Sequence, residues 1–110
     1  MGIQYKVLGQ VAPANTSNAN LYTVPAATST VASTLRVANL TATAATFSIY
    51  VRVAGAAASA ANTVAKDVTL APNSIFSATE GMTLAATDVI TVQSATANAL
   101  AFHLFGSEIS

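Results

Sequence analysis

The chain has 110 residues, enough for one small domain, and only 7% are charged, with four basic and four acidic side chains that balance to zero. So few scattered basic residues cannot neutralise a run of phosphates, which argues against nucleic-acid binding. The chain has no cysteine and no apolar run of about 18 residues, which excludes disulfides, cysteine–zinc sites and a membrane-spanning helix.

The low charge also bears on association. Typical soluble domains carry about 25% charged residues, and a near-neutral surface repels other copies only weakly. We therefore expect much of the surface to be covered in an assembly, the alternative being a neutral monomer. The first residues lack the basic start, apolar block and cleavage site of a signal peptide, so we expect synthesis in a cytoplasm without a targeting segment.

In the first half of the chain, β-branched and aromatic residues alternate with period two between turn residues, a pattern typical of strands. The first expected strand is 3–11, followed by a loop over 13–20 that is rich in Pro, Asn and Ser. A short strand, 21–24, stops at Pro25, and a long strand follows at 30–40.

The clearest strand, 46–53, follows a turn at 39–44. Its apolar face consists of Phe47, Ile49, Val51 and Val53. Tyr50 and Arg52 point to the opposite face of this strand. The next segment, 55–62, is rich in alanine and has helix propensity, but it is too short for an isolated helix, so we expect a loop with at most one helical turn.

The second half repeats the strand pattern. The expected strands are 64–70, 74–78, 82–84, 88–94 and 99–105. The turns between them are expected at Pro72–Asn73, Glu80–Gly81 and 95–98, and residues 106–110 are expected to form an exit segment.

This pattern predicts an all-β fold, a single β-sandwich over residues 1–110 of jelly-roll or immunoglobulin-like type with about eight short antiparallel strands. We expect less than about 15% helix, well under the norm for globular proteins. The expected core consists of Val7, Leu35, Val37, Phe47, Ile49, Val51, Val89, Leu100, Phe102 and Leu104.

Residues that could carry chemistry are few. His103 is the single histidine, and no Gly-x-Ser-x-Gly turn accompanies it, so we expect an ordinary strand residue. The carboxylates of Asp67, Glu80, Asp88 and Glu108 fall in or beside turns and strand ends, where solvated charges are usual. We therefore expect no enzymatic activity, no cofactor and no metal site.

Interface residues are the more promising candidates. Tyr50 and Arg52 share the face of their strand that the core does not use, and Tyr5 and Lys6 lie in the first strand. Tyrosine and arginine are enriched at the energetic centres of interfaces. We expect these four residues to contact a partner, the alternative being an ordinary exposed sheet face.

Five stretches cover much of the chain and carry a resemblance. They are 5–10 (YKVLGQ), 20–25 (NLYTVP), 42–47 (ATAATF), 83–92 (TLAATDVITV) and 105–109 (FGSEI). Together they resemble small virion proteins of tailed bacteriophages, particularly those of cyanobacterial and marine hosts. The resemblance implies a β-sandwich module of the virion and brings no catalytic or binding residue with it.

The resemblance implies two functions. The first is a capsid decoration, or cement, protein that binds the major capsid protein and stabilises the head lattice. The alternative is a tail, baseplate or fibre module involved in host adsorption. The loops at 15–20 and 56–61 are poor in aromatic residues, which favours the capsid. We further expect a homotrimer, a number that follows from capsid quasi-symmetry and not from the residues.

Overall fold

The computed structural model describes residues 2–79 and 81–110. Its strands pair as if the whole chain were one long antiparallel hairpin, with the first strand beside the last and the middle strands beside each other. The strands are β1 (Ile3–Val11), β2 (Ala19–Thr23), β3 (Ser29–Asn39), β4 (Ala45–Arg52), β5 (Thr63–Leu70), β6 (Ile75–Ala78), β7 (Met82–Leu84), β8 (Val89–Ser94) and β9 (Leu100–Ile109). Strand β1 pairs with β9, β2 with β8, and β4 with β5, while β3 pairs with both β6 and β7.

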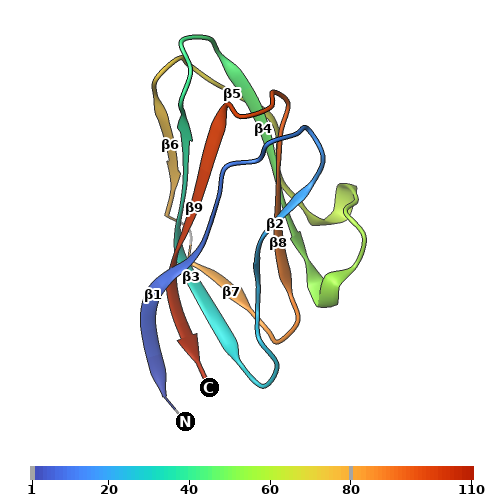
Figure 1. Ribbon diagram of the computed structural model, residues 1–110. Helices are drawn as coiled ribbons and strands as arrows, with labels where there is room; N and C mark the ends of the chain where they lie inside the picture. Colours follow the sequence, from blue (N-terminus) through green and yellow to red (C-terminus); the bar gives the residue numbers. More distant parts are fainter. Residues whose placement is uncertain (1, 80) are drawn as a thin grey trace.

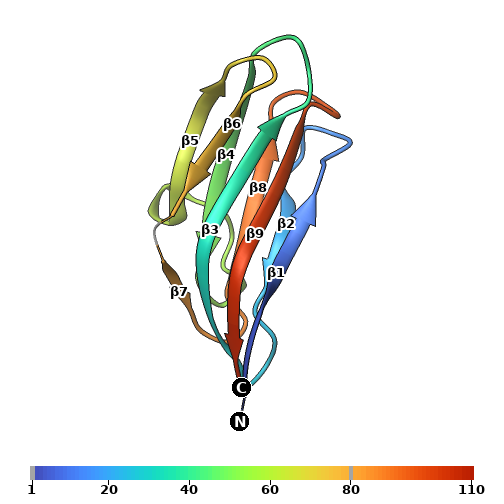
Figure 2. The ribbon, with the colours of Figure 1, turned by 90° about the vertical axis from the view of Figure 1, so that its left-hand side faces the viewer.

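This hairpin is rolled up so that β9 also pairs with β3 and β8 also pairs with β4. One sheet has the order β1-β9-β3-β6, with β7 also beside β3, and the other has the order β2-β8-β4-β5 (Figures 1 and 2). The expected all-β sandwich is confirmed. Of its two expected types, this strand order is that of a jelly roll and not that of an immunoglobulin domain.

Helix content is as low as the sequence predicts, with 59% strand and 6% helix. Two single 3₁₀ turns, η1 (Val53–Gly55) and η2 (Ala60–Asn62), lie in and beside the alanine-rich segment for which a loop with one helical turn was expected. The expected turn at Glu80–Gly81 includes Glu80, which lies outside the described residues.

The core fills the space between the two sheets. Phe47 of β4 is its centre, because its ring lies 5.3 Å from the Phe76 ring and 6.2 Å from the Phe102 ring, so that it contacts side chains of the opposite sheet. Eight of the ten expected core residues are buried, and Val51 is partly buried against them.

Val7 is the error in the expected core, since 48% of its surface is exposed. The register between β1 and β9 shifts between Val7 and Gly9, which is the signature of a β-bulge at Leu8. The extra residue reverses the alternation, so that Val11 points into the core while Val7 points away from it. Period-two reasoning cannot see such a reversal.

The last strand is longer than expected. Residues 106–109, expected to leave the sheet as an exit segment, continue β9 between β1 and β3. At Gly106 the neighbouring backbone is so close that a Cβ atom would lie 2.1 Å from the carbonyl oxygen of Val31. The glycine therefore permits close strand approach at this point and does not end the strand.

Replacing Gly106 with alanine tests this approach. G106A is expected to destabilise the fold by about 1–3 kcal/mol, since backbone atoms of β3 must move to admit a methyl group. G2A is the matched control, because nothing lies within 4 Å of the position of its added Cβ. Urea unfolding monitored by far-UV circular dichroism measures both. Equal midpoints for G106A and the wild type would contradict the packing described here.

Candidate functional site

The outer face of the β2-β8-β4-β5 sheet is partly covered by the chain itself. The segment from 53 to 62 leaves β4 and packs over this face before entering β5 (Figure 1). Tyr50 lies under it and is only 8% exposed. A hollow of about 560 Å³ remains beside Tyr50, with Asn18, Ser59 and Lys66 among its lining residues.

Arg52 holds the covering segment in place. Its guanidinium donates hydrogen bonds to the carbonyl oxygens of Gly55 and Ala56, at 2.9 and 2.6 Å. A third nitrogen donates to the side chains of Asn20 and Thr91, at 3.2 and 3.1 Å. Small side chains let these carbonyls approach the guanidinium.

These contacts correct one expectation from the sequence. Tyr50 and Arg52 do share the outer face of β4, but Tyr50 is mostly covered and Arg52 is only partly exposed, so neither projects freely from that face as expected. The alanine-rich segment covers Tyr50, and the guanidinium of Arg52 makes its hydrogen bonds within the chain. No feature of the sequence indicates this covering, because the alanine-rich segment carries no large side chain that would mark it as packed.

The outer face of the other sheet is open, and the part of it beside β1 is largely apolar. Ile3, Tyr5 and Val7 of β1 are 57%, 83% and 48% exposed. In the sheet register Ile3 lies opposite Ile109, and Val7 lies opposite Phe105. Val31 of β3 lies opposite Ser107 and adds to the same surface. We call the residues Ile3, Tyr5, Val7, Val31, Phe105 and Ile109 the apolar outer face.

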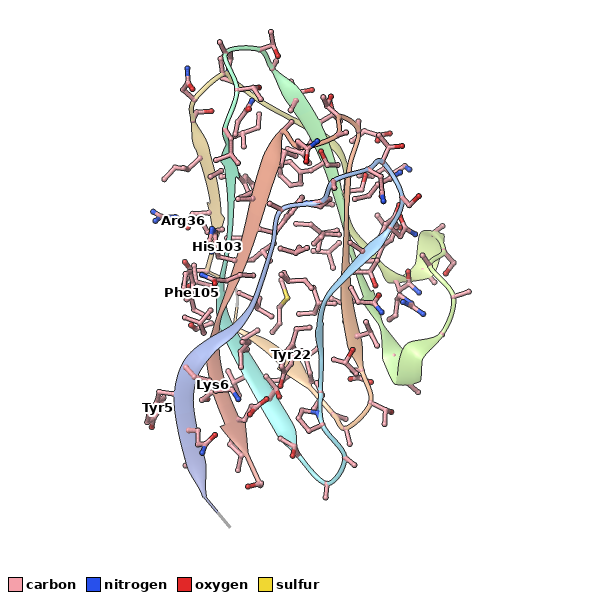
Figure 3. The ribbon with its side chains drawn as sticks, viewed as in Figure 1. Tyr5, Lys6, Tyr22, Arg36, His103 and Phe105 are labelled. Carbon is pink, nitrogen blue, oxygen red and sulfur yellow. The ribbon has the colours of Figure 1, made fainter. Side chains whose placement is uncertain are left out.

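His103 and Arg36 border the apolar outer face and are the polar side chains paired next to it on β9 and β3 (Figure 3). The His103 ring is stacked parallel to that of Phe105, with centroids 6.3 Å apart, and its Nδ1 atom is 3.2 Å from the Gln10 amide nitrogen. Its cross-strand neighbours are Gln10 and Arg36, neither of which is a nucleophile or an acid. His103 is therefore placed as a packed strand residue.

Lys6 lies on the opposite side of β1 from Tyr5, and its side chain remains 43% exposed. Its ammonium is 2.8 Å from the Glu108 carboxylate, whose side chain is only 12% exposed. The second carboxylate oxygen accepts a hydrogen bond from the Tyr22 hydroxyl, which also lies 2.8 Å from the Thr30 hydroxyl. This network joins the two sheets through β2, so the charge of Lys6 is paired within the chain and only Tyr5 of the two expected β1 contacts projects outward (Figure 3).

The network shifts the pKa of both acidic groups. Burial, reinforced by the hydrogen bond to Glu108, raises the pKa of Tyr22 to about 12. The hydrogen bond from Lys6, followed by that from Tyr22, lowers the pKa of Glu108. From the sequence, Glu108 was expected to be a solvated charge at a strand end, and this network was not predicted. Lys6 and Glu108 lie at opposite ends of the chain and come together only when the first and last strands pair.

The other described carboxylates do not form a site. Asp88 is buried and accepts hydrogen bonds from the backbone of Ala54 and Ala85, each at 2.9 Å, so it is structural and not solvated as expected. Asp67 is exposed and lies 4.0 Å from Lys66, and Glu80 lies outside the described residues. Within residues 2–79 and 81–110, no three metal-binding side chains gather.

The class of the protein is therefore set by its fold: a jelly-roll β-sandwich with one open apolar face. Comparisons with protein-family models, curated proteins and solved structures found no match to this chain. In the described part of the chain, no helix has the length and hydropathy needed to cross a membrane.

The Glu108 network predicts a pH-dependent contribution to stability. Folding lowers the pKa of Glu108. The ionised carboxylate therefore contributes its full stabilisation above the pKa of glutamate in the unfolded chain, about 4.3. This stabilisation is lost as the pH falls through the lower pKa of Glu108 in the folded protein. E108Q removes the charge and is expected to cost about 1–2 kcal/mol at pH 7. The difference from the wild type should shrink as the pH falls below about 4.

The matched control for this experiment is D67N, which removes an equally charged but exposed carboxylate and should leave stability nearly unchanged. Denaturation curves at a series of pH values measure both variants. If E108Q were as destabilised at low pH as at neutral pH, its effect would not come from the charge of Glu108.

Proposed function

We propose that this protein is a non-enzymatic structural component of a phage virion, and that it acts as a capsid decoration protein stabilising the head lattice. The observation that carries the proposal is the apolar outer face of the β1-β9-β3 sheet. Its three β1 residues are exposed, and Val31, Phe105 and Ile109 are partly exposed beside them. On a chain this small, such an apolar surface supports a site of contact with another protein.

The charge distribution supports the same role. The ammonium of Lys6 is turned inward to Glu108, and the residues of the apolar outer face carry no charge. Contacts between neutral surfaces are screened little by salt, so they persist over a wide range of ionic strength. The jelly roll also occurs in viral capsid proteins, and the resemblance of five stretches to virion proteins adds to this support.

A cement protein of this kind does no chemistry and acts by mass action. It binds the assembled shell across junctions between major capsid proteins and does not bind dissociated subunits. Binding one state alone stabilises it by about 2.7 kcal/mol per site at a hundredfold excess over Kd. Copies at neighbouring junctions add their weak contacts through avidity. Synthesis in the host cytoplasm followed by incorporation into the virion fits this role.

Self-association on the shell belongs to the proposal. A closed ring of three copies at a local three-fold axis of the lattice would let each copy use the same contact with its neighbour. That number is taken from the symmetry of capsids, so it stays a prediction for the particle.

Removing the protein from the particle tests the proposal. Shells that lack it should still assemble but should release DNA at a lower temperature than intact particles, because one stabilising equilibrium is gone. Adding back purified protein should restore the release temperature. The measurement is fluorescence of a DNA-binding dye during heating.

Two variants, at valines of nearly equal exposure, test which surface of the protein binds the shell. V7D places a charge on the apolar outer face, where Val7 is 48% exposed, and V64D places one on β5 of the other sheet, where Val64 is 45% exposed. V7D should bind depleted shells at least tenfold more weakly than the wild type, whereas V64D should bind normally. Equal binding of both variants would contradict the assignment of this face.

The second candidate function is a tail or fibre module for host adsorption. The hollow beside Tyr50 favours it, because Asn18, Ser59 and Lys66 supply polar groups around an aromatic edge that could receive a polar group of a host surface. Particles that lack the protein, keep their heat stability and fail to adsorb to cells would establish this function and exclude the cement role.

A further inference from the structure

Strand β1 is an edge strand with a free backbone side. Among the strands of the described residues, it pairs with β9 alone (Figure 2). Gly2 and Ser110 exchange both of their backbone hydrogen bonds, at 2.8 and 2.9 Å. In an antiparallel pair such residues alternate, so Gln4 and Lys6 also direct their N–H and C=O groups to β9.

The residues between them direct their backbone groups away from the sheet. Ile3, Tyr5 and Val7 therefore present their N–H and C=O groups along the free edge, and the described part of the chain supplies no backbone partner for them. The same three side chains are the most exposed part of the apolar outer face. At these three residues, both the backbone hydrogen-bonding groups and the apolar side chains are therefore available for contact with another chain.

Protected edge strands carry proline or an outward charge, and this half of β1 has neither. No proline occurs between residues 3 and 11. The single charged side chain, that of Lys6, is held by Glu108 on the inner side. Nothing in this stretch opposes the addition of another strand.

The sequence of this edge is suited to its own copy. From Ile3 to Val7 the order is aliphatic, polar, aromatic, polar, aliphatic, which reads the same in both directions around Tyr5. A two-fold axis at Tyr5 would place Ile3 opposite the second copy's Val7. Lys6 would then face the second copy's Gln4, so the two lysines would not meet.

We propose that two copies of this chain pair antiparallel through residues 3–7 of β1, centred on Tyr5, and so join their β1-β9-β3 sheets into one. The three residues with free backbone groups would each exchange two hydrogen bonds across the axis. Such an isologous contact is closed at two copies. The inference concerns the isolated protein in solution. Its two-fold contact is separate from the three-fold contact proposed for the shell and does not depend on a role in the virion.

Cysteine cross-linking of the full chain tests the register. The chain has no cysteine, so each variant carries one introduced thiol. Y5C should form a disulfide-linked dimer on mild oxidation, because Cα atoms of hydrogen-bonded partners lie about 5.5 Å apart, within disulfide range. V7C alone should remain uncross-linked, but V7C mixed with I3C should give a mixed dimer. The exposed loop variant L40C is the control and should not cross-link.

Sedimentation equilibrium of the wild type tests the number of copies. The expected result is a reversible monomer–dimer equilibrium, abolished in Y5K, where two ammonium groups would face each other, and unchanged in L40K. Mixing Y5K with Y5E should restore a one-to-one dimer. A wild type that is only monomeric, or that forms trimers, would overturn the proposal, as would V7C cross-linking as readily as Y5C.

These outcomes are separate from those of the particle experiments. A dimer in solution together with shells that do not need the protein would refute the cement role alone. Cross-linking of Y5C to the major capsid protein and not to a second copy would overturn the dimer and show that a strand of the shell occupies this edge.

Discussion

The fold depends on the pairing of the first strand with the last. Strand β1 joins the sheet only through β9, and β9 in turn lies between β1 and β3. Gly106 permits the close approach of β9 to β3, since a Cβ atom there would lie 2.1 Å from the Val31 carbonyl oxygen. Gly9 permits a close approach of β1 to β2 of the opposite sheet, since a Cβ atom there would lie 2.2 Å from the Leu21 carbonyl oxygen. The Lys6–Glu108 ion pair then joins β1 and β9 on their inner side.

The same pairing creates the surface on which the proposed function rests. The bulge at Leu8 turns Val7, and with it Tyr5, to the outside, although simple alternation would direct them to the core. Because Lys6 is then directed inward, the outer side is left without its charge. A single extra residue in β1 therefore explains both the inner network and the apolar outer face.

The outer faces of the two sheets differ in how far the chain itself covers them. On the β2-β8-β4-β5 sheet, Arg52 and the segment from 53 to 62 cover the surface from within the chain. On the opposite sheet, no described segment covers Ile3, Tyr5 and Val7. This uncovered face is the observation on which the proposed contact with another protein rests.

The sequence by itself determined the all-β class, the strand positions to within a few residues and most of the core, because these follow from local alternation and turn chemistry. Phe47 and Phe102 could be assigned to the core in this way. The tertiary structure alone decided the jelly-roll order, the outward turn of Val7, the covering of Tyr50 and the pairing of Lys6 with Glu108. Each of these depends on contacts between residues far apart in the chain, and such contacts leave no periodic trace in the segments that make them.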